Sequence, residues 1–263
     1  MERKLGIVSD CIIGEEPIDT LDRIKKAGFE TFFTGRIDEP TVSALVNKAD
    51  KLGLECEFIH APFKGINYMW TPGVDYLPVY NGMKESIDTA SKCGVKTVIT
   101  HVSSGWHPPQ VCDIGLSRYD ALVEYAISKN VILAFENLRK LGNLACLMER
   151  YENVENVKFC YDCGHEHCYT AIVPFLDFYG KKIICTHIHD NHGRDWSRPE
   201  EDTDEHLLPF DGTVDYKLMM QKLDKADYRG SLMLEVFNAK YQHMTPDEFV
   251  ADCYARIKKI SQM

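Results

Sequence analysis

The residues of this chain that are best suited to acid–base or metal chemistry lie at the ends of short apolar runs. Six runs end, or nearly end, in an imidazole or a carboxylate: His60, His101, Glu136, Asp162, His187 and Glu235. If these ends meet, three carboxylates repel one another and take up protons unless a cation is present. Imidazole and carboxylate ligands together suit Zn²⁺, Mn²⁺, Fe²⁺ or Co²⁺ better than Ca²⁺. The pattern predicts a divalent-metal centre, and the alternative is a set of hydrated polar strand ends.

The runs that carry these residues have the length and composition of β-strands. Eight such runs, rich in Val, Ile, Phe and Thr, cover residues 4–9, 29–35, 54–60, 95–102, 131–138, 157–162, 183–190 and 231–237. Amphipathic segments separate them, as in PIDTLDRIKKAG, which has Pro17 at its start and Gly28 at its end. We expect further helices over 39–53, 79–94, 118–130, 144–154, 170–180, 214–227 and 246–260.

Strand-then-helix units repeated eight times predict parallel strands with right-handed crossovers. In a chain of 263 residues this favours a single (β/α)8 TIM barrel, one domain over 1–263. A doubly wound open sheet is the rival fold, but SDCIIGEEP after the first run is not the glycine-rich phosphate loop of such sheets. A barrel places its active site at the carboxyl ends of the strands, so the six residues would meet there.

Two expected connections, 61–77 and 191–213, are longer than the others, and such loops are usually functional. Trp70 and Trp196 fall in them and either cap a pocket or pack the loop. Lys64, Arg139 and Arg194 follow the third, fifth and seventh runs. They either contact a phosphate or carboxylate of a substrate or are solvated loop charges.

Composition limits the class of protein. The formal net charge is −10, from 30 Lys and Arg against 40 Asp and Glu, which argues against a partner with a phosphate backbone. The N-terminal apolar run is too short for a signal peptide, and no segment has the roughly 20 apolar residues of a membrane span. We therefore expect a cytoplasmic protein whose ten cysteines are reduced. Cys160 and Cys163 form a lone CxxC motif, with no second one to complete a zinc site.

The segments HAPFKGIN, THVSSG, AFENL, YDCGH, HIHDN, DEHLLPFDGTVDY and LEVF occur in an order and spacing that resemble the xylose isomerase-like (β/α)8 superfamily. That superfamily contains sugar isomerases and epimerases and the endonuclease IV class of apurinic endonucleases. The resemblance implies a metal held by Glu136, Asp162, His187 and Glu235. His189 is the second choice for the ligand after the seventh strand.

The resemblance gives further residues two alternative roles. His165 touches a substrate oxygen in the epimerases and binds another metal in the endonucleases. The endonuclease pattern adds four ligands, so the chain has the residue types for one to three ions: His60, His101, Asp204 and His206. Two features depart from the endonucleases. The segment after Asn191 has an acidic excess that would repel DNA, and PFDGTVDY replaces the glycine-rich loop usual at that point.

We expect a metal-dependent sugar or sugar phosphate isomerase or epimerase in which Glu136 and Glu235 transfer a proton through a metal-stabilised enediolate. The expected partner is a small polyhydroxy substrate rather than nucleic acid or membrane. A homo-oligomer is compatible with this interpretation. The expected substrate contacts are His165, His189, Lys64, Trp70 and Arg194. The alternatives are an endonuclease IV-like multinuclear phosphodiesterase, a metal-dependent sugar or polyol dehydratase, and a non-enzymatic metal-binding module.

Overall fold

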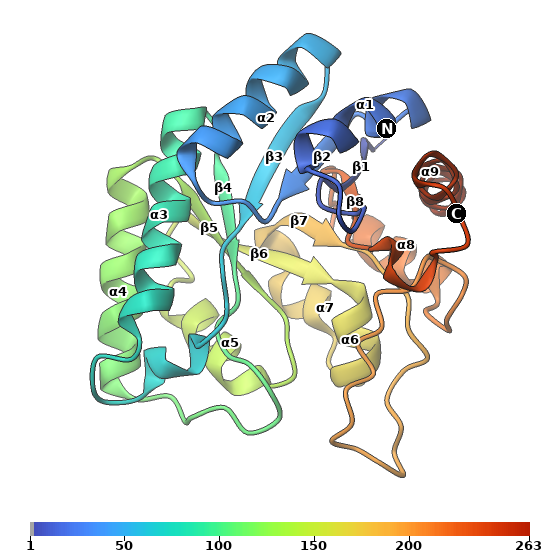
Figure 1. Ribbon diagram of the computed structural model, residues 1–263. Coiled ribbons are helices and arrows are strands. Elements are labelled where there is room, and N and C mark those ends of the chain that lie inside the picture. Colours follow the sequence, from blue (N-terminus) through green and yellow to red (C-terminus); the bar gives the residue numbers. More distant parts are fainter. Residues whose placement is uncertain (1–2) are drawn as a thin grey trace.

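Eight parallel strands surround the centre of the computed structural model, which describes residues 3–263 (Figure 1). They are β1 (Leu5–Val8), β2 (Thr31–Thr34), β3 (Glu55–His60), β4 (Thr97–Thr100), β5 (Ile132–Glu136), β6 (Val157–Asp162), β7 (Ile183–His187) and β8 (Leu232–Leu234). Hydrogen bonds join them in the order β7-β6-β5-β4-β3-β2-β1-β8. The ring closes where the Ile188 N–H donates to the Met233 carbonyl (2.8 Å) and the Glu235 N–H to the Ile188 carbonyl (3.0 Å). The predicted TIM barrel is confirmed.

Helices cover the outside of the barrel (Figure 1). They are α1 (Pro17–Ala27), α2 (Glu39–Leu52), α3 (Leu77–Cys93), α4 (Asp113–Ser128), α5 (Leu141–Arg150), α6 (Cys163–Tyr169), α7 (Phe175–Tyr179), α8 (Tyr216–Lys225) and α9 (Pro246–Ser261), with 3₁₀ turns η1 (Ile66–Trp70), η2 (Gly180–Lys182) and η3 (Asn238–Lys240). Gly28 (φ 112°) and Gly53 (φ 64°) end α1 and α2 in the left-handed conformation that favours glycine.

Two helices differ from the sequence prediction for local reasons. The helix expected over 170–180 shrinks to α7, because Pro174 disfavours helical geometry in the residue before it and becomes the N-cap. Helix α6 was not predicted, because CGHEHCY has no apolar periodicity. It starts where the Asp162 carboxylate accepts a hydrogen bond from the His165 N–H (2.7 Å). This helix therefore places His165 just beyond the end of β6.

The barrel interior forms an apolar floor beneath the strand ends. The rings of Phe33 and Phe58 stack with centroids 4.8 Å apart, and the imidazole of His187 stacks on Phe33 at 4.9 Å. All three side chains are buried. Because close-packed aromatic groups leave little freedom to a buried ring, His187 is held in one orientation at the base of the site.

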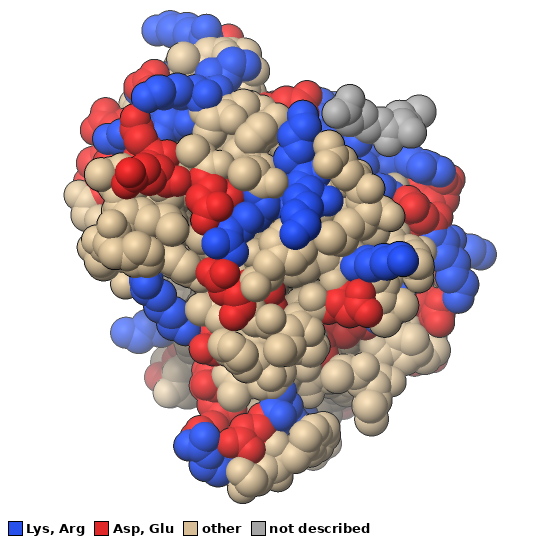
Figure 2. All heavy atoms as spheres, turned by 90° about the vertical axis from the view of Figure 1, so that its right-hand side faces the viewer, with Lys and Arg blue, Asp and Glu red and all other residues tan. Residues whose placement is uncertain are grey.

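Charges of both signs are mixed on the face that includes α9, where Figure 2 shows Lys and Arg interspersed with Asp and Glu. The described residues on that face form no uniformly basic surface of the kind that binds a phosphate backbone. None of the described helices has both the length and the apolar character needed to cross a bilayer.

Candidate functional site

The strand ends bring the six predicted residues together at one mouth of the barrel. Four of them are the last residues of β3, β5, β6 and β7, and two directly follow β4 and β8. In chain order they are His60, His101, Glu136, Asp162, His187 and Glu235. All are buried except Glu235, whose side chain is 14% exposed. The closure of the barrel thus brings these six side chains together, as the sequence pattern predicted.

Glu136 lies at the centre of this group. Its Oε2 is 3.3 Å from His60 Nε2 and 3.2 Å from His101 Nε2. Its Oε1 is 3.0 Å from His187 Nδ1 and 3.3 Å from His165 Nδ1. Burial alone would raise the pKa of Glu136, but the surrounding imidazoles, His187 and His101 first, hold that pKa well below its ordinary value. Glu136 is therefore an ionised carboxylate whose two oxygens each face two imidazoles.

One group of donors, which we call the inner cluster, surrounds His187. The Nδ1 atom of His187 is 3.3 Å from Glu235 Oε2 and 3.9 Å from Asp162 Oδ2. Burial would lower the pKa of His187, but Glu235 and Glu136 raise it to about 10. The donor atoms of the cluster lie within 4.8 Å of one another: Glu136, Asp162, His187 and Glu235. This is the ligand set that the resemblance implied.

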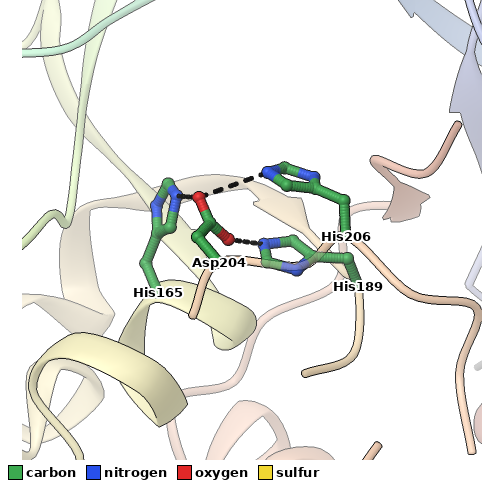
Figure 3. A group of neighbouring side chains, drawn as sticks. All are labelled: His165, His189, Asp204 and His206. Atoms are coloured by element: carbon green, nitrogen blue, oxygen red, sulfur yellow. Dashed lines mark hydrogen bonds and ion pairs between the residues drawn. The ribbon is translucent and has the colours of Figure 1, made fainter. Parts of the chain in front are cut away.

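A second group, the outer cluster, lies beside it and contains His165, His189, Asp204 and His206 (Figure 3). Asp204 Oδ2 is 3.1 Å from His165 Nε2 and 3.4 Å from His206 Nε2. Asp204 Oδ1 is 3.6 Å from His189 Nε2. His187 and His189 are two residues apart, yet they belong to different clusters, and the Nε2 of His189 also lies 3.2 Å from Asp162 Oδ1 of the inner cluster.

Both clusters fit a divalent metal. Several of their buried polar atoms have no hydrogen-bond partner among the described residues: Asp162 Oδ2, His187 Nε2, both ring nitrogens of His189, and Asp204 Oδ1. Buried polar atoms are normally paired, and orphaned imidazole nitrogens beside carboxylate oxygens are suitable metal donors. Removing the carboxylate repulsion also requires positive charge there.

A cavity of about 490 Å³ opens directly above the clusters. Donors from both clusters line its base, and its walls come from the connections after β3, β4, β5 and β7: Phe63, Ser104, Gly105, Trp106, Leu138, Arg139, Glu200 and Asp202. The volume suits a small molecule. Phe63 and Trp106 give the cavity aromatic walls.

Arg139 and Trp106 form one wall with the acidic segment. The Arg139 guanidinium forms an ion pair with Asp202 Oδ2 (2.5 Å) and lies over the ring of Tyr169, 4.0 Å from its centroid. Arg194 lies over Trp106 at 4.4 Å. The sequence pattern did not single out Trp106 or Phe63, because both lie a few residues into connections beyond the predicted strand ends that identified His60 and His101.

Asn137 is a positioning residue that sequence reasoning also missed. Its Oδ1 accepts a hydrogen bond from the Asp162 N–H (2.8 Å), and its Nδ2 donates to the Asp162 carbonyl (2.8 Å). Its own carbonyl accepts a hydrogen bond from His165 Nδ1 (3.0 Å). Asn137 thus fixes β5 against β6 and orients one ligand of each cluster.

Four predicted substrate contacts do not line this cavity, and one of them, His189, is fully buried in the outer cluster. Trp70 is buried in η1, where its indole N–H donates to the Val102 carbonyl (2.7 Å), so it packs the loop. Lys64 is exposed and absent from the lining. Arg194 borders a neighbouring cavity and reaches this one only through its contact with Trp106. The direction of a loop side chain depends on loop conformation, which spacing alone does not specify.

Comparisons with known proteins agree with the fold. The sequence profile described as xylose isomerase-like TIM barrel matches residues 21–256. The y4fM protein of Sinorhizobium fredii is 31% identical over 173 residues, 60% of this chain and 53% of that protein, so the chain spans about half the length of this relative.

Two solved structures superpose over nearly the whole chain. The IOLI protein with a binding zinc atom has a TM-score of 0.80 at 16% identity and covers 98% of each chain. A D-tagatose 3-epimerase-like protein has a TM-score of 0.74 at 20% identity, over 98% of this chain and 97% of the other. At these identities the likeness establishes the fold.

Proposed function

The chain belongs to the xylose isomerase-like TIM barrel family, and we propose that it is a divalent-metal-dependent isomerase or epimerase of a small sugar. One observation carries the proposal: the inner cluster lies at the base of a cavity of sugar size, with the carboxylate of Glu235 lining that cavity. The family membership and the epimerase-like structure of similar fold support the same assignment.

A divalent cation held by Glu136, Asp162, His187 and Glu235 would polarise a substrate carbonyl and acidify the neighbouring C–H bond. We assign proton removal to Glu235, because it borders the cavity, whereas Glu136 is fully buried. Glu136, 3.0 Å from His187 Nδ1, is the second carboxylate of the expected pair; because it is ionised and buried beneath the cavity, we assign it to holding the cation, and the protonated Glu235 can return the proton to the substrate. His165 borders the cavity and is the proposed donor to the substrate oxygen that gains charge.

The walls of the cavity favour a neutral sugar over a sugar phosphate. Arg139 is the one Lys or Arg among the described residues that lines it, and Asp202 already pairs with that guanidinium. Phe63 and Trp106 offer flat apolar surfaces for the C–H faces of a sugar. We therefore propose a non-phosphorylated polyhydroxy substrate.

The test is a proton-exchange screen. Metal-loaded protein is incubated in D₂O with a panel of ketoses and their phosphates, and deuterium incorporation is followed by NMR. We expect deuterium next to the carbonyl of a neutral ketose, together with its epimer or isomer. Loss of water to form an unsaturated product would identify a dehydratase instead. Exchange restricted to phosphorylated sugars would contradict the proposed substrate class.

A second candidate, a multinuclear phosphodiesterase, rests on the position of Glu136 between donor groups. Besides the inner cluster, its Oε2 forms a three-donor group with His60 and His101. Two metals bridged by Glu136 would suit phosphodiester hydrolysis. The acidic residues Glu200 and Asp202 at the cavity make a nucleic acid the less favoured substrate. Metal-dependent nicking of an abasic oligonucleotide would reverse this preference.

A further inference from the structure

His189 is the residue of the outer cluster that the ligand pattern of the related endonucleases does not supply. We propose that His189 completes a four-donor metal site with His165, Asp204 and His206, and that the ion there is structural and fixes the acidic segment 192–206 as a wall of the cavity. This inference does not depend on the reaction catalysed at the inner cluster.

The hydrogen bonds of two imidazoles point their free nitrogens at one place. His165 Nδ1 donates to the Asn137 carbonyl (3.0 Å), and His206 Nδ1 donates to the Glu235 carbonyl (2.8 Å). With one proton on each Nδ1, both Nε2 atoms face Asp204 Oδ2, at 3.1 Å for His165 and 3.4 Å for His206. Without a cation each Nε2 needs a second proton to donate to this carboxylate, and a cation among the three atoms would replace those protons.

His189 supplies a fourth donor to the same place. Its side chain is fully buried, Nδ1 has no hydrogen-bond partner among the described residues, and Nε2 lies 3.2 Å from Asp162 Oδ1. Its ring stacks on that of His206 with centroids 3.9 Å apart, which sets the two Nε2 atoms side by side facing Asp204 (Figure 3). Asp204 Oδ1, also without a hydrogen-bond partner, is 3.6 Å from His189 Nε2. A buried imidazole whose Nδ1 has no partner and whose Nε2 faces two carboxylates is well placed to bind a cation.

The two clusters differ in donor chemistry. Three imidazoles and one carboxylate suit tetrahedral Zn²⁺, and four protein ligands leave no open position in a tetrahedral site. The inner cluster has three carboxylates and one imidazole, which suits a metal of higher coordination number that keeps places for substrate oxygens. We therefore assign the structural role to the outer site.

Before Asp204, the segment that this ion would hold is attached by contacts nearer the surface. Asp202 forms an ion pair with Arg139 (2.5 Å) and accepts a hydrogen bond from the Tyr169 hydroxyl (2.7 Å), and Glu200 pairs with exposed His107 (3.0 Å). Exposed ion pairs contribute little stability. An ion bound by Asp204 and His206 would fasten the carboxyl end of the segment to α6 and to the residues after β7.

The experiment measures metal content and segment protection, not activity. Metal-free protein is titrated with Zn²⁺, bound metal is counted by elemental analysis, and cleavage after Glu200 and Glu201 by glutamyl endopeptidase is followed by mass spectrometry. Co²⁺ absorption reports four-coordinate geometry. The variants are His189→Asn and Asp204→Asn, with His192→Asn as the matched control, because His192 lies in the same segment but bonds only Glu205.

We expect each of the first two variants to lose one Zn²⁺ per chain, with binding weakened by more than about 100-fold, since even partners outside the ligand set are worth about 10–100-fold. Cleavage should become at least about tenfold faster, while His192→Asn behaves as the unmodified protein. Wild-type protein and His192→Asn should gain protection as the outer ion binds, whereas His189→Asn and Asp204→Asn should not. The proposal is overturned if His189→Asn keeps the full metal content and the four-coordinate Co²⁺ spectrum. It is also overturned if Asp204→Asn keeps the ion that His189→Asn loses, or if Zn²⁺ gives wild-type protein no protection.

Discussion

Gly164 lies directly against the imidazole of His189. A β-carbon added at position 164 would fall 2.0 Å from Cε1 and 2.4 Å from both ring nitrogens of His189. The backbone of α6 approaches the ring this closely only because residue 164 has no side chain. The space that the His189 ring occupies thus depends on a glycine two residues after Asp162, in the short helix that also carries His165.

Gly164→Ala should displace His189 and destabilise the protein. Overpacking a buried site costs about 1–3 kcal/mol, which corresponds to a fall in Tm of roughly 2–12 °C for a chain of this size. Zn²⁺ binding at the outer cluster should weaken in the same variant. Gly142→Ala in α5 is the control, because a β-carbon there meets no atom within 4 Å, and it should leave both measurements unchanged or raise Tm. Equal Tm values and zinc affinities for wild type and Gly164→Ala would show that His189 has room to move.

Glu235→Gln should remove proton transfer while leaving the fold intact. Glutamine keeps the size of the side chain but cannot accept the substrate proton, so kcat for deuterium exchange should fall by about 10²–10⁴-fold. Circular dichroism and metal content show whether the barrel and the inner ion survive the change. Turnover at the wild-type rate with the metal bound would exclude Glu235 as the base.

The fold could be predicted because its signals are local. The apolar runs match β3 and β6 to within a residue, and glycines at positions 28 and 53 end helices as expected. The six strand-end residues converge because closure of any parallel barrel gathers those positions at one mouth. Neither inference needed the conformation of a loop.

What could not be predicted depends on the connections. Whether Trp70 or Trp106 borders the cavity is decided by the path of the chain after β3 and β4, where no periodicity constrains it. The assignment of His189 to the outer cluster depends on Asp204, which reaches it from a connection without regular structure. Helix α6 was missed because its residues are functional groups without an apolar stripe. At these positions the residues are explained by the functional site and not by the local preference of the sequence for a helix or a strand.

Chelation should lower the stability of the protein. Without a cation, the inner and outer clusters bury carboxylates and imidazoles whose unpaired atoms have no other partner. A metal present at about 100 times its Kd stabilises the native state by about 2.7 kcal/mol, so its removal should lower Tm by roughly 5–10 °C. Re-addition of Zn²⁺ or Mn²⁺ should restore Tm, whereas Ca²⁺ should not, because imidazoles are poor ligands for it. Equal Tm values with and without chelator would contradict metal binding at both clusters.

Trp106→Ala should weaken substrate binding more than Trp196→Ala. Trp106 lines the cavity, while Trp196 is 72% exposed and lies outside it, although both contact Arg194. Loss of an aromatic contact of about 0.5–1.5 kcal/mol should raise KM by about 2–12-fold. Steady-state kinetics on the substrate found in the exchange screen measure this effect. An equal rise in KM for both variants would place the effect in the Arg194 contact instead of the substrate surface.

Glu57→Gln should stabilise the protein at neutral pH, and the gain should disappear in acid. Glu57 lies at the amino-terminal end of the barrel, away from the metal clusters, where its carboxylate accepts a hydrogen bond from Ser231. Burial raises the pKa of Glu57 above the ordinary glutamate value, and hydrogen bonds from Ser231 and Thr31 only partly offset this. The folded state therefore binds this proton more tightly than the unfolded state, and the stability contributed by Glu57 falls as pH rises through and above the ordinary value.

Glutamine keeps the hydrogen-bond acceptor without the charge, so the Tm of Glu57→Gln should exceed that of wild type at pH 7. The difference should shrink as pH falls through the raised pKa of folded Glu57 toward about 4.5, and it should be gone below that pH, where the carboxyl is protonated in both states. Thermal denaturation of the two proteins across this range measures the difference directly, and acid effects common to both cancel. A difference that stays constant with pH would mean that packing, and not ionisation of Glu57, separates the two proteins.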